Sequence, residues 1–428
     1  MTQGPSEVRA TLLRARVVAP VSQPPLEDGA VLVSDGVIQA VGRWADLDSA
    51  ARGETVDLGD VIVLPGLINA HAHLDYTGMA GLLPPLKSFP DWIKSILALK
   101  SNYAYSDYAE SWSRGAQMLV QTGTTTVADI EAVPELLPDL WEATPLRVHS
   151  FLEMTGVRSR RMPEAVLAEA ADHAERLPVG RCRVGLSPHA PYSTTPHLLR
   201  LAAAKAAEKG WRLTIHAAES QEEFAMFTQA QGSMFDWLRR NDRDMADCGG
   251  GSPIRQLERC GVLNPALLAV HVNYLAEGDA ALLGRHGVSV AHCPRSHAYF
   301  GHKRFPLDTL TQAGVNLCLG TDSLATVLKG PRDQVQLDLF AEIRALARAE
   351  PGLAPDHILR MATVNGARAL GREGELGELR EGALADLIAI GWQPSLGGIH
   401  EAVVHHPGKV VAAMIGGRWV IPPPPQPG

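Results

Sequence analysis

The sequence predicts an α/β protein, a (β/α)8 TIM barrel with a small composite β-sandwich domain built from both termini. Two observations favour this fold. The middle of the chain alternates short apolar runs with helix-like stretches, as repeated strand–helix units do. Both ends carry short apolar runs that are interrupted by glycine, proline and aspartate. The length of 428 residues suits a large barrel beside a smaller domain.

Eight apolar runs in the middle of the chain are the expected barrel strands. They span residues 61–73, 124–130, 147–153, 182–190, 211–219, 267–273, 288–294 and 315–322. The helix-like segments between them end near glycine or proline, as helices commonly do. No GxGxxG motif opens any of these helices, which argues against a doubly wound open sheet.

The two ends of the chain share a β-like texture, in AVLVSDGVIQAVG near the start and KVVAAMIGGRWV near the end. We therefore expect residues 1–60 and 375–428 to form the composite β domain and residues 61–374 to form the barrel. Residues 230–262 are the longest irregular piece. This segment is either a lid or substrate loop of the barrel or an insertion without function.

Composition excludes several classes of protein. The net charge of -8 does not indicate a nucleic-acid-binding protein, which would be expected to carry a basic surface. The five cysteines are scattered and never spaced as CxxC, so neither a disulfide framework nor a zinc ribbon is expected. No apolar run reaches the length of about 18 residues that a spanning helix needs, and the start lacks a signal-peptide pattern. We expect a cytoplasmic protein without a membrane partner. A homodimer is expected only because homodimers are common among proteins in general.

Four side chains that can bind a metal lie at the ends of three predicted strands. His71 and His73 are two residues apart on one strand, so both imidazoles face the same side. His216 ends the run WRLTI and Asp322 ends VNLCLGT. Alone, His216 reads as a core histidine and Asp322 as a helix N-cap. Together, at the end of a barrel where catalytic residues collect, they predict a metal site.

Two further residues at the strand ends suit proton transfer. Glu219 follows His216 by three residues, where its carboxyl group can move a proton between water and a leaving group. His271 ends the sixth strand and could bind the reacting water or serve as a fifth ligand. The fourth strand, CRVGLSPHA, has no lysine that could bridge two ions. We therefore expect one divalent metal per chain, and the ligand types suit Zn²⁺ and Fe²⁺ equally.

These motifs together resemble the amidohydrolase superfamily. The segments PGLINAHAHLD, HAAE and LGTDS and the lone His271 are similar to its mononuclear deaminase branch, and the likeness covers nearly the whole chain. The resemblance implies that the four residues above bind the metal and that Glu219 shuttles protons. It implies that His271 orients or polarises water and substrate, and that Asp322 also accepts a proton from water. The HxE and PCxxC signature of cytidine deaminases is absent.

The loops that follow the strands resemble those of nucleoside deaminases. SPHAPYS resembles the loop of adenosine-type deaminases, which implies that His189 contacts the substrate. CPRSHAYFGHKRFPL carries His297 where this branch commonly has asparagine. This segment and FPDWI, which contains Trp92, resemble the 6-amino-6-deoxyfutalosine deaminases of menaquinone biosynthesis. That substrate is an adenine nucleoside with a carboxyphenyl ketone chain.

Such a substrate needs an aromatic wall and a cation in the cavity. Trp92 and Phe300 are candidates to stack on its rings. Arg295 and the RSRR run, with Arg158 first, are candidates to bind its carboxylate in bidentate fashion. The plain alternatives are that the aromatic residues belong to the core and that RSRR is a solvated charge run.

We therefore predict hydrolytic deamination of 6-amino-6-deoxyfutalosine to futalosine and ammonia. The alternatives within the same chemistry are deamination of S-adenosylhomocysteine, methylthioadenosine or adenosine, and guanine deaminase or chlorohydrolase activity. The alternative that is not an enzyme is a non-catalytic barrel scaffold. Such a scaffold would be recognised by the lack of a tightly bound divalent ion in the purified protein.

Overall fold

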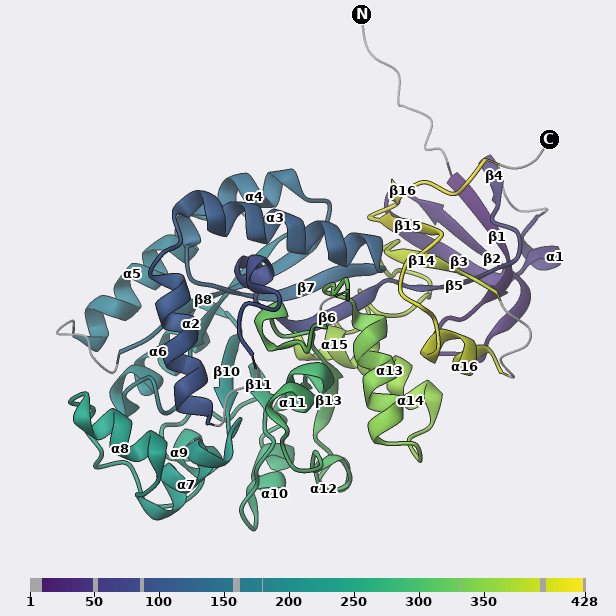
Figure 1. Cartoon of the computed structure of the whole chain (residues 1–428). Coiled ribbons are helices and arrows are strands. Elements are labelled where there is room, and N and C mark those ends of the chain that lie inside the picture. The colour runs from purple at the N-terminus through teal and green to yellow at the C-terminus, as the bar shows by residue number, and fades with distance from the viewer. Residues whose placement is uncertain are drawn as a thin grey trace, which may run out of the picture.

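The computed structural model describes residues 10–48, 53–84, 88–156, 162–178, 180–330, 332–392 and 398–425. These residues form a barrel of eight parallel strands covered by helices and a separate mixed sheet (Figure 1). The first and the last strand of the chain both lie in the separate sheet, which is called the end sheet below. The predicted fold class is confirmed.

The eight barrel strands are parallel to one another and follow chain order around the barrel. They are β6 (Leu67–Ala72), β7 (Thr124–Glu131), β8 (Arg147–Met154), β9 (Arg183–Pro188), β10 (Leu213–Ala217), β11 (Leu267–His271), β12 (Ser289–His292) and β13 (Asn316–Leu319). A parallel bridge between Ala72 and Asp322 joins the first strand to the last. Because this bridge closes the ring, all eight strand ends surround one site.

Alternating side chains of the strands pack on the two sides of the barrel wall. Ile68 and Ala70 of β6 point inward and pack in one buried cluster with Phe151 of β8. Val127 and Leu152 belong to a second cluster, which includes residues of the surrounding helices. Burial on both sides explains why the strands read as continuous apolar runs in the sequence.

Helices cover the outside of the barrel and connect its strands. They are α2 (Phe89–Lys100), α3 (Tyr105–Gln121), α4 (Leu137–Ala143), α5 (Pro163–Arg176), α6 (Pro196–Lys209), α7 (Gln221–Gln229), α8 (Ser233–Arg240), α9 (Pro253–Arg259), α10 (Asp279–Arg285), α11 (Pro294–Phe300), α12 (Leu307–Gln312), α13 (Leu339–Ala349), α14 (Pro355–Met361) and α15 (Val364–Ala369). Two short 3-10 helices, Leu74–Met79 and Leu324–Thr326, follow β6 and β13. Within the part of the chain that the structure describes, no helix is long and apolar enough to cross a membrane.

The end sheet combines strands from both ends of the chain. Its strands are β1 (Ala10–Val18), β2 (Leu26–Ser34), β3 (Val37–Arg43), β4 (Gly53–Asp57), β5 (Val61–Pro65), β14 (Leu387–Gly391), β15 (Ala412–Ile415) and β16 (Arg418–Ile421). The short helix α1 (Trp44–Leu47) packs against β2 and β3, whereas α16 (Ile399–Val404) packs against the barrel helices α13 and α14. Val63 and Ala389 belong to a core on one face of this sheet, whereas Ile62 and Ile388 belong to the core shared with the barrel helices.

The segment 61–73, predicted as a single strand, is two strands. β5 pairs with β1 and β14 in the end sheet, and β6 begins the barrel. The chain changes sheets at Gly66, where a Cβ atom would lie 2.1 Å from the Thr125 hydroxyl oxygen. Glycine is therefore required by the close approach of this side chain.

The segment 230–262 is more regular than predicted, because α8 and α9 lie within it. The missed signal for α9 is Ser252 followed by Pro253. The Ser252 hydroxyl accepts a hydrogen bond from the Arg255 backbone N–H, and proline occupies the first turn. The irregular part is the Asp- and Gly-rich stretch between the two helices.

Candidate metal centre and active site

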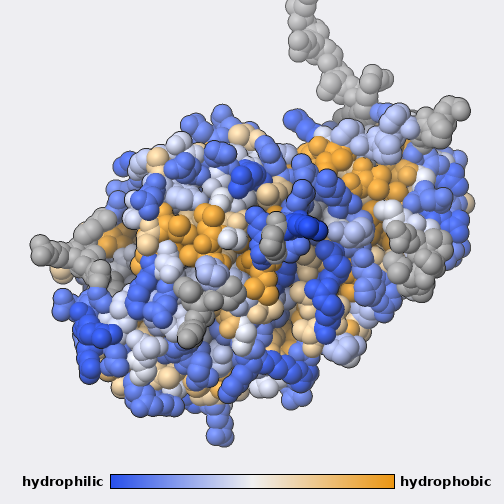
Figure 2. All heavy atoms as spheres, in the orientation of Figure 1, coloured by the Kyte–Doolittle hydropathy of each residue, from blue (hydrophilic) through white to orange (hydrophobic). Residues whose placement is uncertain are grey.

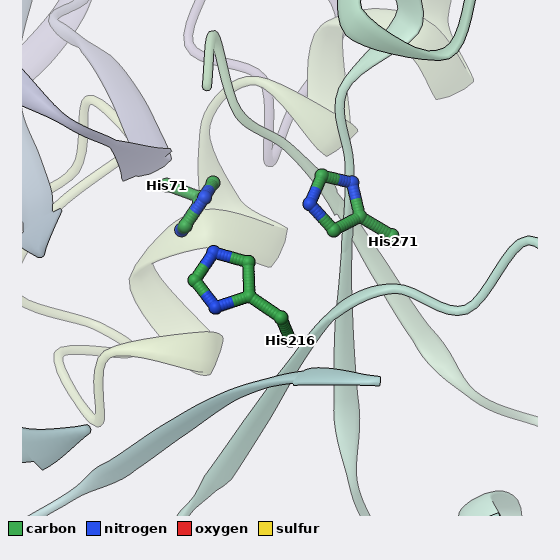
Figure 3. Close-up of side chains that lie close together, drawn as sticks. All are labelled: His71, His216 and His271. Atoms are coloured by element: carbon green, nitrogen blue, oxygen red, sulfur yellow. The ribbon is translucent and has the colours of Figure 1, made fainter. Parts of the chain in front are cut away.

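The four predicted metal ligands meet at the carboxyl ends of the barrel strands. The Nε2 atoms of His71 and His73 each lie 3.7 Å from Asp322 Oδ1. His73 Nε2 lies 3.3 Å from His216 Nε2. The imidazoles of His71, His216 and His271 converge from β6, β10 and β11, as Figure 3 shows. The ligand atoms of His71, His73 and Asp322, and likewise those of His71, His216 and His271, lie close enough to share one ion.

The chemistry of this cluster fits a divalent cation. His71 Nε2 is buried, and it has no hydrogen-bond partner in the described part of the chain. Burial and the neighbouring imidazoles lower the pKa of His73 and His216 well below the usual histidine value, so both rings are neutral. Burial opposes ionisation of Asp322, but its contacts with the surrounding histidines hold the pKa of this carboxyl well below its usual range. Neutral imidazoles and a carboxylate are ligands that Zn²⁺ and Fe²⁺ accept.

Hydrogen bonds outside the cluster orient its ligands. His216 Nδ1 donates to the His189 carbonyl oxygen at 2.9 Å, which leaves Nε2 free for a metal. Asp322 Oδ2 accepts hydrogen bonds from the hydroxyls of Ser296 at 2.6 Å and Thr326 at 3.1 Å. The Ser323 backbone N–H donates to Asp322 Oδ1 at 2.8 Å. The ligand orientation is therefore fixed before any ion binds.

The backbone at two of these strand ends has an unusual conformation. His271 has φ of 72°, Val272 has 49° and Asp322 has 52°, all in the left-handed region. This conformation is unfavourable for residues with a Cβ atom and especially for β-branched valine. The surrounding structure maintains this strain at the positions that place His271 and Asp322 in the site.

Glu219 lies beside the metal cluster in a position suited to proton transfer. Its Oε1 atom is 3.5 Å from His271 Nε2, and the residue is buried. Burial raises the pKa of Glu219 well above its usual value, and the nearby carboxylates of Asp322 and Glu223 raise it further. Burial also lowers the pKa of His271 to about 3, so this ring is neutral. A carboxyl group with a raised pKa can hold a proton and release it near neutral pH.

A cavity of about 520 Å³ opens above this cluster. Its lining includes His73, His216, Glu219, His271 and Asp322 at one end, and Phe89, Trp92, Tyr192 and Trp237 along the wall. Phe89 and Trp92 stack with ring centroids 5.9 Å apart, and Phe300 packs edge-on against Trp92 at 5.2 Å. Figure 2 shows hydrophobic residues gathered beside α2, the helix that contributes this wall.

The predicted substrate residues differ in their placement. His189 and Trp92 line the cavity. Arg295 does not, because its guanidinium pairs with buried Glu342 and donates to the Gln336 carbonyl oxygen at 3.0 Å.

Two more of these residues are not in the cavity wall that the structure describes. His297 is not among the lining residues and packs against His292 and His302, with ring centroids 5.3 Å away in each case. Arg158 and the rest of the RSRR run lie outside the described residues.

The cavity lining includes residues that the sequence patterns do not single out, among them Tyr76, Lys100 and Glu153. Glu153 ends the predicted strand 147–153, so the rule that barrel sites collect at strand ends could have found it. Lys100 ends a helix that follows the first strand, and no pattern in the sequence marks it.

Comparison with known proteins agrees with this geometry. The model of the amidohydrolase family matches residues 62–420. The chain belongs to the amidohydrolase family. With a cluster of His and Asp side chains that could hold a metal ion, it is a metal-dependent hydrolase acting on carbon–nitrogen bonds.

Relatives of this amidohydrolase include 5-methylthioadenosine/S-adenosylhomocysteine deaminases. That of Syntrophobacter fumaroxidans is 31% identical, over 92% of this chain and 88% of the relative. An adenosine deaminase from Xanthomonas campestris, solved with bound zinc, is 26% identical with a TM-score of 0.85, covering 97% of this chain and 93% of that one. The aminofutalosine deaminase of Helicobacter pylori has the same fold, with 21% identity, a TM-score of 0.83, and coverage of 96% and 100%.

Proposed function

We propose that this amidohydrolase removes the 6-amino group of an adenine nucleoside by hydrolysis and releases ammonia. The observation that carries the proposal is buried Glu219, 3.5 Å from His271 and beside four metal-binding side chains at the inner end of an aromatic cavity. The names of the relatives support an adenine nucleoside as the substrate, since those proteins are deaminases of methylthioadenosine, S-adenosylhomocysteine and adenosine.

The residues divide the chemistry between them. His71, His73, His216 and Asp322 would hold a divalent cation, whose Lewis acidity makes water nucleophilic near neutral pH. Glu219 accepts a proton from water as the water oxygen bonds to C6 of the purine. Glu219 then delivers this proton to the exocyclic nitrogen, and ammonia leaves as the C6–N bond breaks.

The neighbours of Glu219 complete this arrangement. His271, neutral and in contact with Glu219, orients the water and the purine. Asp322, whose carboxyl group is ionised before the reaction, accepts the second proton of the water. This proton passes to N1 of the purine as the C6–O double bond forms, so Asp322 is ionised again at the end of the reaction. The buried position of the cluster keeps bulk water from competing for these groups.

The substrate that we propose first is 6-amino-6-deoxyfutalosine, with deamination to futalosine in menaquinone biosynthesis. The aromatic wall formed by Phe89, Trp92 and Tyr192 supports an aromatic extension on the sugar. Methylthioadenosine and S-adenosylhomocysteine are the second candidates, and the relative at 31% identity favours them. For 6-amino-6-deoxyfutalosine, we still predict that Arg158 binds the carboxylate of the substrate.

Steady-state kinetics on a panel of nucleosides tests the proposal. The panel contains 6-amino-6-deoxyfutalosine, S-adenosylhomocysteine, methylthioadenosine and adenosine, and deamination is followed by the change from adenine to hypoxanthine absorbance. We expect the highest kcat/KM for 6-amino-6-deoxyfutalosine. A higher value for methylthioadenosine would reverse the order of the two candidates, and no turnover of any member would contradict the deaminase proposal.

A further inference from the structure

Two buried or half-buried charged side chains in the cavity have no part in the chemistry described above. Apart from the metal ligands and Glu219, the charged residues in the described lining are Lys94, Lys100 and Glu153. Lys94 is largely exposed and pairs with Asp91 at 2.8 Å. Lys100 and Glu153 are withdrawn from solvent in a wall that is otherwise mostly apolar. Charged groups in such a setting need polar partners.

Lys100 is connected to the metal cluster through one aromatic ring. Its ammonium group donates to the Tyr76 hydroxyl and lies 4.8 Å from the centroid of that ring. Tyr76 in turn stacks on the metal ligand His73 with ring centroids 5.1 Å apart. Burial would lower the pKa of Lys100, but the acidic groups around it, including Glu153, outweigh burial and raise it, so the ammonium group stays charged. An ammonium group has three N–H donors, and Tyr76 uses one of them.

Glu153 reaches the cluster through a different ring. Its side chain, at the end of β8, is 13% exposed, and its Oε1 atom lies 3.9 Å from His189 Nε2. The His189 ring lies 4.8 Å from the ring of His216, another metal ligand. Among the residues that the structure describes, none donates a hydrogen bond to the Glu153 carboxylate. Its oxygens are therefore available to a ligand in the cavity.

The opposite charges of this pair restrict what can bind between them. A carboxylate drawn to Lys100 would be repelled by Glu153, and an ammonium group drawn to Glu153 would be repelled by Lys100. A neutral hydroxyl satisfies both, because it donates one hydrogen bond and accepts others. In a nucleoside, the sugar is attached to the side of the purine ring system opposite C6. Lys100 is separated from His73 by the Tyr76 ring, and Glu153 is separated from His216 by the His189 ring. A purine with C6 at the cluster would therefore bring its sugar toward these two charged groups.

We propose that Lys100 and Glu153 form the subsite for the sugar hydroxyls, with Glu153 accepting hydrogen bonds from them and Lys100 donating to their oxygens. The proposal rests on the proposed function, since it assumes that the purine occupies the metal cluster. It makes both residues determinants of specificity for ribose over deoxyribose.

The test compares adenosine with 2′-deoxyadenosine and 3′-deoxyadenosine in wild type, Glu153→Gln and Lys100→Met. For wild type, we expect kcat/KM to favour adenosine by about 10- to 100-fold, the effect of a hydrogen bond to a charged group. In Glu153→Gln and Lys100→Met, this preference should fall at least about fivefold, mainly because adenosine is turned over less well. Zinc content, measured in parallel, should stay at the wild-type level.

Two matched controls separate a subsite from a general effect on the cavity. Lys94→Met removes a lysine from the same helix and the same cavity, and Glu135→Gln removes an exposed glutamate near Glu153 that does not line the cavity. Both should keep the wild-type preference for adenosine. A preference that is unchanged in Glu153→Gln and Lys100→Met, or equal losses for all three nucleosides, overturns the subsite while the proposed function stands. A wild-type protein that deaminates no adenine nucleoside overturns both.

Discussion

At the scale of single residues, the proposed proton transfer depends on the position of Glu219. Its carboxyl group contacts neutral His271, and the backbone around it is held in place. The Glu219 N–H donates to Glu223 Oε2 at 2.8 Å, and its carbonyl oxygen accepts from Asn273 Nδ2 at 2.9 Å. The side chain can therefore be changed without moving the backbone, which makes a conservative substitution informative.

Replacing Glu219 with glutamine should abolish most turnover and leave the metal bound. Because the amide cannot accept and return a proton, we expect kcat to fall about 10²- to 10⁴-fold. The four metal ligands are untouched, so zinc content measured by plasma emission spectroscopy should match that of wild type. If Glu219→Gln retained wild-type activity, the proton-transfer role would be wrong.

A buried histidine in β8, outside the proposed metal cluster, predicts the acid sensitivity of the fold. His149 in β8 stacks on Phe151 with ring centroids 4.6 Å apart, and burial lowers its pKa to about 3. The unfolded chain binds a proton near pH 6.5, whereas the folded protein does so only near pH 3. The stability that neutral His149 contributes is thus present above pH 6.5 and is lost as the pH falls toward 3.

Thermal unfolding of His149→Phe between pH 7 and pH 5 tests whether His149 lowers the stability of the fold as the pH falls. The phenyl ring retains the stacking on Phe151 but does not titrate. We expect the Tm of wild type to fall more steeply with decreasing pH than the Tm of the variant. Parallel Tm curves for the two proteins would show that His149 takes no part in the acid sensitivity.

At the scale of elements, the order of the barrel strands and their ends could be predicted from the sequence. Parallel strands buried on both sides give apolar runs that are easily recognised, and the proposed ligands lie at their ends. The division of residues 61–73 could not be predicted, because β5 pairs with β1 and β14 whereas β6 pairs with β7, and the local sequence indicates neither set of partners. Arg295 was assigned to the cavity because nothing in the sequence indicates its ion pair with Glu342.

The junction between β5 and β6 is expected to be sensitive to a single methyl group. In Gly66→Ala, the new Cβ atom would lie 2.1 Å from Thr125 Oγ1, so the two strands must shift. Overpacking of this kind costs about 1–3 kcal/mol. Chemical denaturation should show this loss for Gly66→Ala and little loss for Gly391→Ala, where no atom lies within 4 Å. Equal stability of the two variants would contradict the close approach of Thr125 as the reason for glycine at position 66.

At the scale of the whole molecule, an ion pair joins the barrel to the end sheet. Arg147 at the start of β8 donates to both carboxylate oxygens of Asp386, at 2.6 and 3.0 Å. Asp386 also accepts the Gly416 N–H at 2.7 Å, and its carbonyl oxygen accepts the Gly66 N–H at 3.0 Å. The aspartate is almost fully buried, so the pair forms part of the packing between the two parts.

Removing one partner of this pair should destabilise the contact between barrel and end sheet. In Asp386→Ala the buried guanidinium of Arg147 loses its counter-ion, and breaking such a pair costs about 3–5 kcal/mol. We expect a lower midpoint in urea for this variant, and a loss of less than about 1 kcal/mol for Asp236→Ala, which removes the exposed pair with Arg239. Equal midpoints for the two variants would show that the ion pair does not contribute to this contact.

Titration of the metal-free protein with Zn²⁺, with deamination followed at each step, is the most direct test of the metal centre. The geometry of His71, His73, His216 and Asp322 predicts no turnover without metal and a linear rise that ends at one zinc ion per chain. Full activity of the metal-free protein, or no activity at any concentration of Zn²⁺ or, in a parallel titration, of Fe²⁺, would contradict the assignment of these four residues.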